Sequence, residues 1–378
     1  MSTAFGFVGV LLGGFVLGCT YYTNCPKEGC PDDPASTGGG GNGSGGSGAS
    51  SAGVTGKPPD GTWVNVTANL AGTESGCGDL QLISAKPDQD ALIAGVASVG
   101  LWISRDGGQS WDPLGTGDGS AAIDNRPTSV VYDAEEPDVF WEAGSYGGGV
   151  FRTRDGGETF ERLGTIVHTD TVSVDLTDPE RNTLLAGAHE QGHKLFKSSD
   201  GGESWTDIGQ NIASDVNACS FPLVLGTDEY LLACSKWGEG VGGIFHTSDG
   251  GDTWDRKSDV SAFSEALVAS DGSIYFGGEA GDLQRSDDQG TTWHRVISGI
   301  QDRIRPVELP DGRIATLAPR YVIATADRGA TWHPVTAELP ASDPTGLAYS
   351  SFQRAFFVWY AGCEASVRAD AIQRFDSD

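Results

Sequence analysis

Basic residues are scarce in this chain of 378 residues, which has 24 Lys and Arg against 52 Asp and Glu and a formal net charge of −28 at pH 7. A surface of that sign repels phosphate backbones and anionic membrane surfaces. Nucleic acid is therefore excluded as a partner of the bulk surface. The excess of carboxylates is expected to serve solubility.

An apolar run long enough to span a membrane is also missing. Residues 4–18 form an uncharged apolar stretch of about fifteen residues, too short for a membrane-spanning helix. No Lys or Arg precedes it, although secretory leaders normally carry positive charge there. The stretch ends in Val16-Leu-Gly-Cys19, which resembles a bacterial lipobox.

This N-terminal pattern predicts export. We expect a signal peptide at 1–18, lipidation of Cys19, a Cys-containing segment at 19–36 and a Gly/Ser-rich flexible tether at 37–60. The alternative is a cleaved, secreted chain without a lipid. Lipidation of Cys19 would hold the protein at the bacterial cell envelope, on the outer membrane or cell surface. The protein would then contact the membrane only through its lipid anchor.

What the chain has in abundance is one short pattern, Ser/Thr-x-Asp-x-Gly-x-Ser/Thr-Trp/Phe. An Asp in such a turn accepts backbone N–H bonds, the Gly permits positive φ, and the aromatic side chain packs between neighbouring units. We therefore interpret the aspartates as scaffold. The pattern occurs six times, with its central residues at Asp106, Asp155, Asp200, Asp249, Asp288 and Asp327.

These copies resemble Asp-box (bacterial neuraminidase, BNR) repeats of sialidase-like, xyloglucan-hydrolase-like, sortilin-like and photosystem-assembly-factor-like proteins. The resemblance implies an all-β fold, a β-propeller over residues 61–378, with each box between the third and fourth strands of a blade. It does not select a function, because one propeller fold hosts unrelated activities.

A seventh blade is predicted although a seventh box is missing. After the sixth box, residues 346–350, 355–360 and 371–375 read as three strands without an outer partner. Residues 61–67 read as a strand that follows a box but stand before the first blade. An N-terminal strand that completes the last blade would close the ring and hide its open edges.

The cysteines favour an oxidising compartment, since six remain when Cys19 is set aside. Cys219 and Cys234 lie on successive predicted strands around a short turn, Cys77 and Cys363 would meet at the seam of the first and last blades, and Cys25 and Cys30 remain. We expect the disulfides Cys219–Cys234, Cys77–Cys363 and Cys25–Cys30; the alternative is free buried thiols.

Ligands are expected on the face opposite the boxes, which the resemblance assigns to the active sites of the family's enzymes. His189-Glu-Gln-Gly-His193 matches the zinc-protease pattern only formally, because it stands between strands and not on a helix. With His168 it forms at most a weak metal site, and no cofactor is expected. The candidate ligand-binding residues are Arg126, Asp170, Trp237, Glu265, Arg305, Arg320 and Tyr321.

The candidates can be set against two kinds of glycosidase site. A sialidase-like site would need Arg126, Arg305 and Arg320 to converge near Tyr321 or Tyr360, but the Phe/Tyr-Arg-Ile-Pro motif of that family is missing. Other glycosidases need two carboxyl groups about 5–5.5 or 6.5–9.5 Å apart. Candidate carboxyl groups are Asp79, Asp170, Asp215, Glu265 and Asp302.

The prediction from sequence is a lipid-anchored, monomeric binding or assembly module for a glycan or an envelope protein. A glycoside hydrolase that uses carboxylates opposite the boxes is the alternative. Xyloglucan hydrolases of the family use two propellers that form a cleft, whereas this chain has length for one.

Overall fold

The computed structural model describes residues 54–76, 78–116, 119–216, 218–236, 240–362 and 364–377. The predicted signal peptide, Cys19, Cys25–Cys30, both cysteines of Cys77–Cys363, and Trp237 lie outside these residues. Among the described residues, no helix has the length and apolar character that crossing a bilayer requires.

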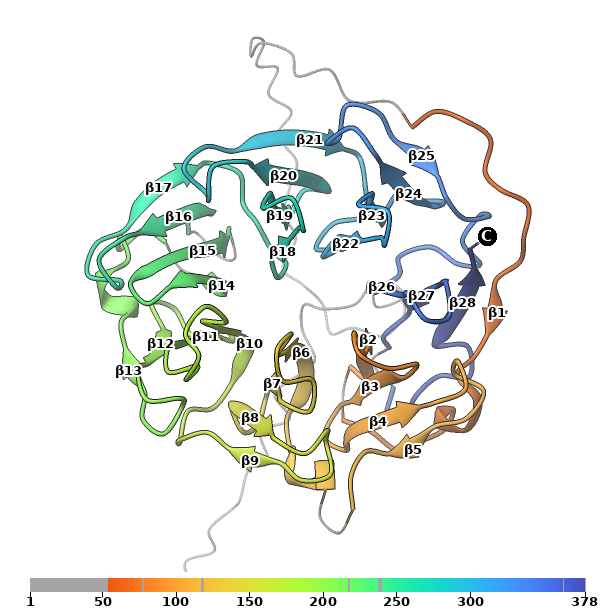
Figure 1. Ribbon diagram of the computed structural model, residues 1–378, viewed down its shortest axis with the longest axis horizontal. Helices are drawn as coiled ribbons and strands as arrows, with labels where there is room; N and C mark the ends of the chain where they lie inside the picture. The colour runs from red at the N-terminus through yellow and green to blue at the C-terminus, as the bar shows by residue number, and fades with distance from the viewer. Residues whose placement is uncertain are drawn as a thin grey trace, which may run out of the picture.

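The described chain folds into seven antiparallel sheets of four strands each, arranged as blades around a central axis (Figure 1). Three short 3-10 helices, η1, η2 and η3, interrupt the strands at Ala68–Leu70, Gly119–Ala122 and Gly209–Asn211. The all-β propeller prediction is confirmed.

The strands of the first four blades follow one another in sequence. Blade one holds β2–β5 at Leu80–Ala85, Leu92–Val96, Gly100–Ser104 and Asp112–Pro113. Blade two holds β6–β9 at Arg126–Tyr132, Phe140–Ser145, Val150–Thr153 and Glu161–Arg162. Blade three holds β10–β13 at Thr169–Val174, Leu184–Ala188, Leu195–Ser198 and Thr206–Asp207. Blade four holds β14–β17 at Ala218–Gly226, Glu229–Ser235, Gly243–Thr247 and Asp255–Ser258.

The remaining blades continue in the same order until the ring closes. Blade five holds β18–β21 at Leu267–Val268, Ile274–Gly277, Asp282–Ser286 and His294–Ser298. Blade six holds β22–β25 at Val307–Glu308, Ile314–Leu317, Val322–Thr325 and His333–Pro334. Blade seven holds β26–β28 at Gly346–Ser350, Ala355–Trp359 and Ile372–Asp376, and β1 at Val64–Asn65.

The N-terminal segment closes the ring as predicted. β1 pairs antiparallel with β28, with Val64 opposite Arg374 and Asn65 opposite Gln373. Upstream, the Thr55 amide donates to the Trp332 carbonyl at 2.9 Å, so the segment also reaches the outer edge of blade six. In Figure 1 this orange segment runs along the outside of blades six and seven.

In each Asp-box, the carboxylate accepts hydrogen bonds from residues of its own turn. In blade one, Asp106 Oδ1 accepts from the Ser104 hydroxyl at 2.8 Å and the Ser110 amide at 2.9 Å, and Oδ2 accepts from the Ser110 hydroxyl at 2.6 Å. Gly107 and Gly108 have φ of 74° and 89°, which a side chain would oppose. The same contacts recur at Asp155, Asp200, Asp249, Asp288 and Asp327.

The hydrophobic core lies between neighbouring blades. Trp141 of blade two, only 1% exposed, packs in one cluster with Leu184 and Ala186 of blade three. Trp111, the last residue of the first box, packs with Phe357 of blade seven. Large aromatic side chains, at box and non-box positions, therefore pack neighbouring blades against each other. Within blade four, a disulfide joins Cys219 on β14 to Cys234 on β15.

Candidate functional site

A pocket of about 710 Å³ opens on the central axis. Its lining includes residues 263–265, 301–303 and 342–345, which precede the first strands of blades five, six and seven. Residues 359–361, at the end of the second strand of blade seven and just after it, also line the pocket. The boxes join third strands to fourth strands. Because strands alternate in direction within a blade, the pocket opens on the face opposite the boxes.

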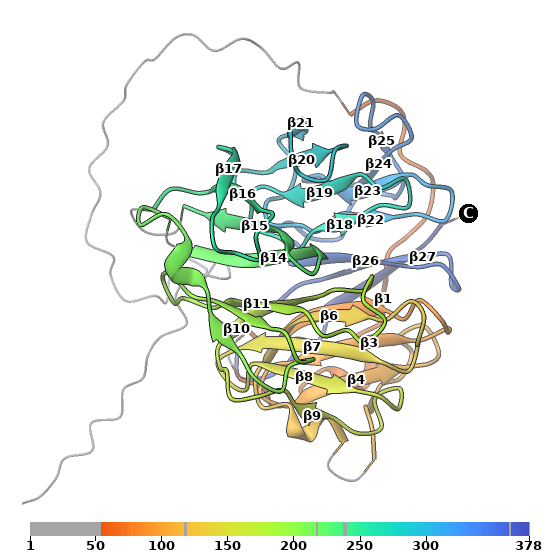
Figure 2. The same ribbon diagram turned by 60° about the vertical axis from the view of Figure 1, so that its left-hand side comes forward.

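The inner strands of several blades form its walls. β6, β10 and β14 lie side by side around the axis, as the turned view in Figure 2 shows. The first strands of blades one to four contribute Gln81, Thr128, Asp170 and Phe221 to the lining. The pocket is therefore a property of the closed ring rather than of one blade.

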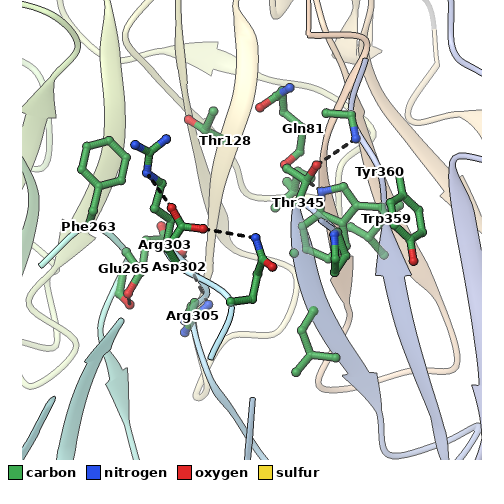
Figure 3. A pocket seen from close by; sticks show the side chains of 18 of the residues that line it. Gln81, Thr128, Phe263, Glu265, Asp302, Arg303, Arg305, Thr345, Trp359 and Tyr360 are labelled. Atoms are coloured by element: carbon green, nitrogen blue, oxygen red, sulfur yellow. Dashed lines mark hydrogen bonds and ion pairs between the residues drawn. The ribbon is translucent and has the colours of Figure 1, made fainter. Parts of the chain in front are cut away.

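One wall of the pocket carries charge (Figure 3). Arg305 Nη1 lies 3.6 Å from Glu265 Oε2, and Arg303 Nε lies 3.6 Å from Asp302 Oδ2. The Arg303 guanidinium also lies 4.9 Å from the centre of the Phe263 ring. Blades five and six thus present alternating, mutually neutralising charges.

Glu265 bridges the axis. The Ser129 hydroxyl of blade two donates to Glu265 Oε1, and this contact links blades that stand across the ring from each other. The Glu265 side chain is 21% exposed. Burial raises the pKa of the Glu265 carboxyl, against the opposing effects of Arg305 and the Ser129 hydrogen bond.

The facing wall is uncharged at Gln81, Thr345, Trp359 and Tyr360, although Asp343 and Arg368 also line the pocket. Gln81 and Thr345 contribute an amide and a hydroxyl, beside Trp359 and Tyr360 (Figure 3). The Trp359 indole donates to the Gln81 carbonyl at 3.2 Å and the Tyr360 hydroxyl to the Ala341 carbonyl at 3.1 Å. Only 7% of Trp359 and 4% of Tyr360 are exposed, so these rings stiffen the wall rather than offer a stacking platform.

Of the residues proposed from sequence, Asp170, Glu265, Asp302, Arg305 and Tyr360 line this pocket. Asp170 Oδ1 lies 2.6 Å from Nδ1 of the buried His189. Trp237 lies outside the described residues.

The other candidates lie away from the pocket. The guanidinium of Arg126 stacks 4.7 Å from the Tyr146 ring centre, and Arg320 pairs with Glu338 at 2.7 and 2.8 Å. Tyr321 packs against the core cluster between blades five and six. The three arginines Arg126, Arg305 and Arg320 therefore do not converge, which removes the geometry that a sialidase-like site would need.

The histidines do not assemble a metal site. His189–His193 follows β11 as a turn, not a helix. Within the ranges that the structure describes, no group of three or more His, Cys, Asp or Glu side chains could hold a metal ion. His189 instead packs against Tyr146, with ring centres 4.6 Å apart.

Sequence reasoning missed the neutral polar residues of the pocket. Gln81, Thr128, Gln301 and Thr345 belong to no motif. One signal was available: the phase of the boxes identifies the first strand of each blade, and polar residues on first strands face the axis. Applied to β2 and β6, that rule would have found Gln81 and Thr128.

Sequence comparison identifies the repeat. Residues 102–113 and 284–295 match the protein family described as BNR/Asp-box repeat. No curated protein matches the sequence significantly.

Solved structures resemble the fold closely enough to align most of the chain. The "GH74 (NkGH74) enzyme" of Niastella koreensis has a TM-score of 0.59 at 17% identity, covering 84% of this chain and 54% of that one. "YCF48 bound to D1 peptide" has a TM-score of 0.54 at 16% identity, covering 87% and 98%. PorZ, a surface component of the type-IX secretion system of Porphyromonas gingivalis, has 0.54 at 12% identity, covering 80% and 47%. This chain thus spans about half the length of the GH74 and PorZ structures, and at these identities the likeness shows the fold alone.

Proposed function

Since the chain is a seven-bladed β-propeller built on BNR/Asp-box repeats, we propose that it is an exported binding module whose axial pocket takes a neutral, hydroxyl-rich glycan. Gln81, Thr128, Gln301 and Thr345 would supply donors and acceptors to sugar hydroxyl groups. The Phe263 ring adds apolar surface at the charged wall.

The observation that carries this proposal is the charge balance of the pocket. Arg303, Arg305 and Arg368 all line it, and each is paired with a carboxylate: Asp302, Glu265 and Asp370 respectively. An anionic ligand would have to displace one of these carboxylates from its arginine and leave a partly buried charge without its partner, which costs free energy. A neutral polar ligand avoids that cost.

The location of the protein is part of the same proposal. The Cys219–Cys234 disulfide fits an oxidising compartment. Lipidation at the lipobox-like Cys19 would anchor the protein at the bacterial cell envelope, and the Gly/Ser-rich tether would connect the propeller flexibly to that anchor.

Glycoside hydrolysis is a second candidate, favoured by one feature. A carboxyl group with a raised pKa can act as a general acid on a glycosidic oxygen. Glu265 has such a pKa and lies in the pocket with Asp170 and Asp302, either of which could be the second carboxylate.

A glycan array probed with the full-length protein tests the proposal. We expect binding to neutral glycans, and a collection bound only through sialic or uronic acids, or not bound at all, would overturn it. Glu265→Gln leaves Arg305 without its carboxylate, so selectivity should shift toward acidic glycans. Glu338→Gln is the matched control, because it releases Arg320 from the same kind of pair outside the pocket. Release of shortened glycan by the wild type, lost in Glu265→Gln, would instead establish the hydrolase.

A further inference from the structure

Three non-glycine residues with left-handed backbones meet on the rim between blades two and three. Tyr146, His168 and Glu190 have φ of 60°, 53° and 51°. The Tyr146 and His168 ring centres lie 6.0 Å apart, and the Tyr146 hydroxyl donates to Glu190 Oε1 at 3.1 Å. Such conformations are costly for residues with side chains and are concentrated at sites that use them.

Tyr146 is held rigidly although it is exposed. The Arg126 guanidinium lies 4.7 Å from its ring centre, and the buried His189 packs edge-on at 4.6 Å. Yet 44% of Tyr146 and 41% of its neighbour Val167 are exposed. Val167 is fixed by a β-bridge to Gly148. A rigid aromatic ring loses little entropy on contact, and tyrosine beside arginine is typical of residues that dominate protein interfaces.

The charges around Tyr146 are mainly negative. Glu190 is exposed, Asp124 lies on the adjoining loop with its Oδ1 accepting from the Gly148 amide at 2.7 Å, and Asp170 lies behind His189. Arg126 is the cation that contacts the ring. Burial, and then Glu190, raise the pKa of Tyr146 to about 12, while Arg126 opposes the rise. The net charge of −28 would further attract a cationic partner.

We infer that this rim patch, formed by Arg126, Tyr146, Val167, His168 and Glu190, docks a polypeptide segment that presents a lysine or arginine. The basic side chain would pair with Glu190, and a neighbouring apolar side chain would lie against Tyr146 and Val167. A neutral glycan in the axial pocket would not use these groups, so the two sites are separable.

Fluorescence polarisation with two labelled heptapeptides tests the inference. One peptide carries two lysines around a central leucine, and the other carries glutamates in place of the lysines. We expect the lysine peptide to bind full-length protein more tightly than the glutamate peptide, and less tightly as salt is raised. Tyr146→Ala should weaken binding about tenfold, as for an interface anchor.

Two charge variants distinguish an effect of the patch from an effect of the overall negative charge of the protein. Glu190→Gln should weaken binding of the lysine peptide at least several-fold. Glu203→Gln removes the same charge from an exposed position in the box of the same blade, and should leave binding unchanged. Equal losses in both variants, no effect of Tyr146→Ala, or no preference for the lysine peptide would each overturn the inference. A thermal unfolding curve for each variant checks that it is folded.

Discussion

Glu142 is the side chain whose replacement most directly tests the electrostatic reasoning. It lies on β7 and is 0% exposed. The Asn125 amide donates to its Oε2 at 3.2 Å, while Oε1 has no hydrogen-bond partner among the described atoms. Burial raises the pKa of Glu142 well above its ordinary value, and Asp124 raises it further against the Asn125 hydrogen bond.

The expected effect of Glu142→Gln follows from proton linkage. Because the folded pKa is raised, the folded chain keeps a proton that the unfolded chain releases above its own pKa, about 4.3. This contribution to stability is complete below the unfolded pKa and is lost as pH rises toward the folded pKa, by about 1.4 kcal/mol per pH unit. Glutamine does not ionise, so the variant lacks this loss. We expect Glu142→Gln to be more stable than the wild type at pH 8, with an advantage that shrinks toward pH 4.

The substitution is close to isosteric. Its amide adds hydrogen-bond donors to a site where Asn125 Oδ1 also lacks a partner. A buried acceptor without a donor costs about 1–3 kcal/mol. The amide of the variant keeps its donors at every pH, whereas the wild-type carboxyl has a donor only while it is protonated.

Urea unfolding curves at half-unit steps from pH 4 to pH 8 provide the assay. Other carboxyl groups with raised pKa values, including Asp79 and Asp282, affect wild type and variant alike. The difference between the two free energies of unfolding therefore isolates Glu142. A difference that does not change with pH, or a variant less stable than the wild type at pH 8, would refute the assignment of a protonated Glu142.

Three further predictions concern stability. Arg181→Met should lower the free energy of unfolding, measured with urea, by about 3–5 kcal/mol, because it leaves the Asp133 carboxylate, 3% exposed, without the guanidinium 2.7 Å away. An unchanged urea midpoint would contradict an energetic role for this contact between blades. Replacing Cys219 and Cys234 together by Ala should cost about 3 kcal/mol, as expected for a loop of 15 residues. The reducing agent dithiothreitol should destabilise the wild type but not that double variant. Asp249→Ala should lower the unfolding temperature at pH 7 and leave glycan binding unchanged. The Thr253 hydroxyl and amide hold the pKa of Asp249 down to about 2, so this stabilisation is present above the unfolded pKa and disappears as pH falls to about 2; loss of glycan binding in folded Asp249→Ala would contradict a purely structural box.

The blades could be predicted from sequence because their signals are local. Each box closes its turn through hydrogen bonds between residues at most four positions apart, as Asp106 with Ser110. Three strands left without a partner made the N-terminal closure by β1 the simplest arrangement. Asp170, Glu265 and Arg305 were placed on the correct face by the same phase argument.

The composition of the site could not be predicted in this way. Arg126 and Arg320 were expected with Arg305, but each long side chain turns to a nearby partner, Tyr146 in one case and Glu338 in the other. Gln81 and Thr128 were not predicted, because a single amide or hydroxyl side chain on a strand belongs to no recognisable sequence motif. The phase of the boxes identifies the first strand of each blade, but the closed ring decides which side chains of those strands line the pocket.

The sequence by itself determined the number of blades, the phase of every strand, the structural role of the box aspartates and the face left for ligands. These depend on hydrogen bonds and hydrophobic patterns within a single blade. The tertiary structure decided which groups meet across the ring: Ser129 with Glu265, and Tyr146 with Glu190. Those contacts depend on the angles at which successive blades pack on one another. Because these angles accumulate around the whole ring, they cannot be inferred from any short stretch of sequence.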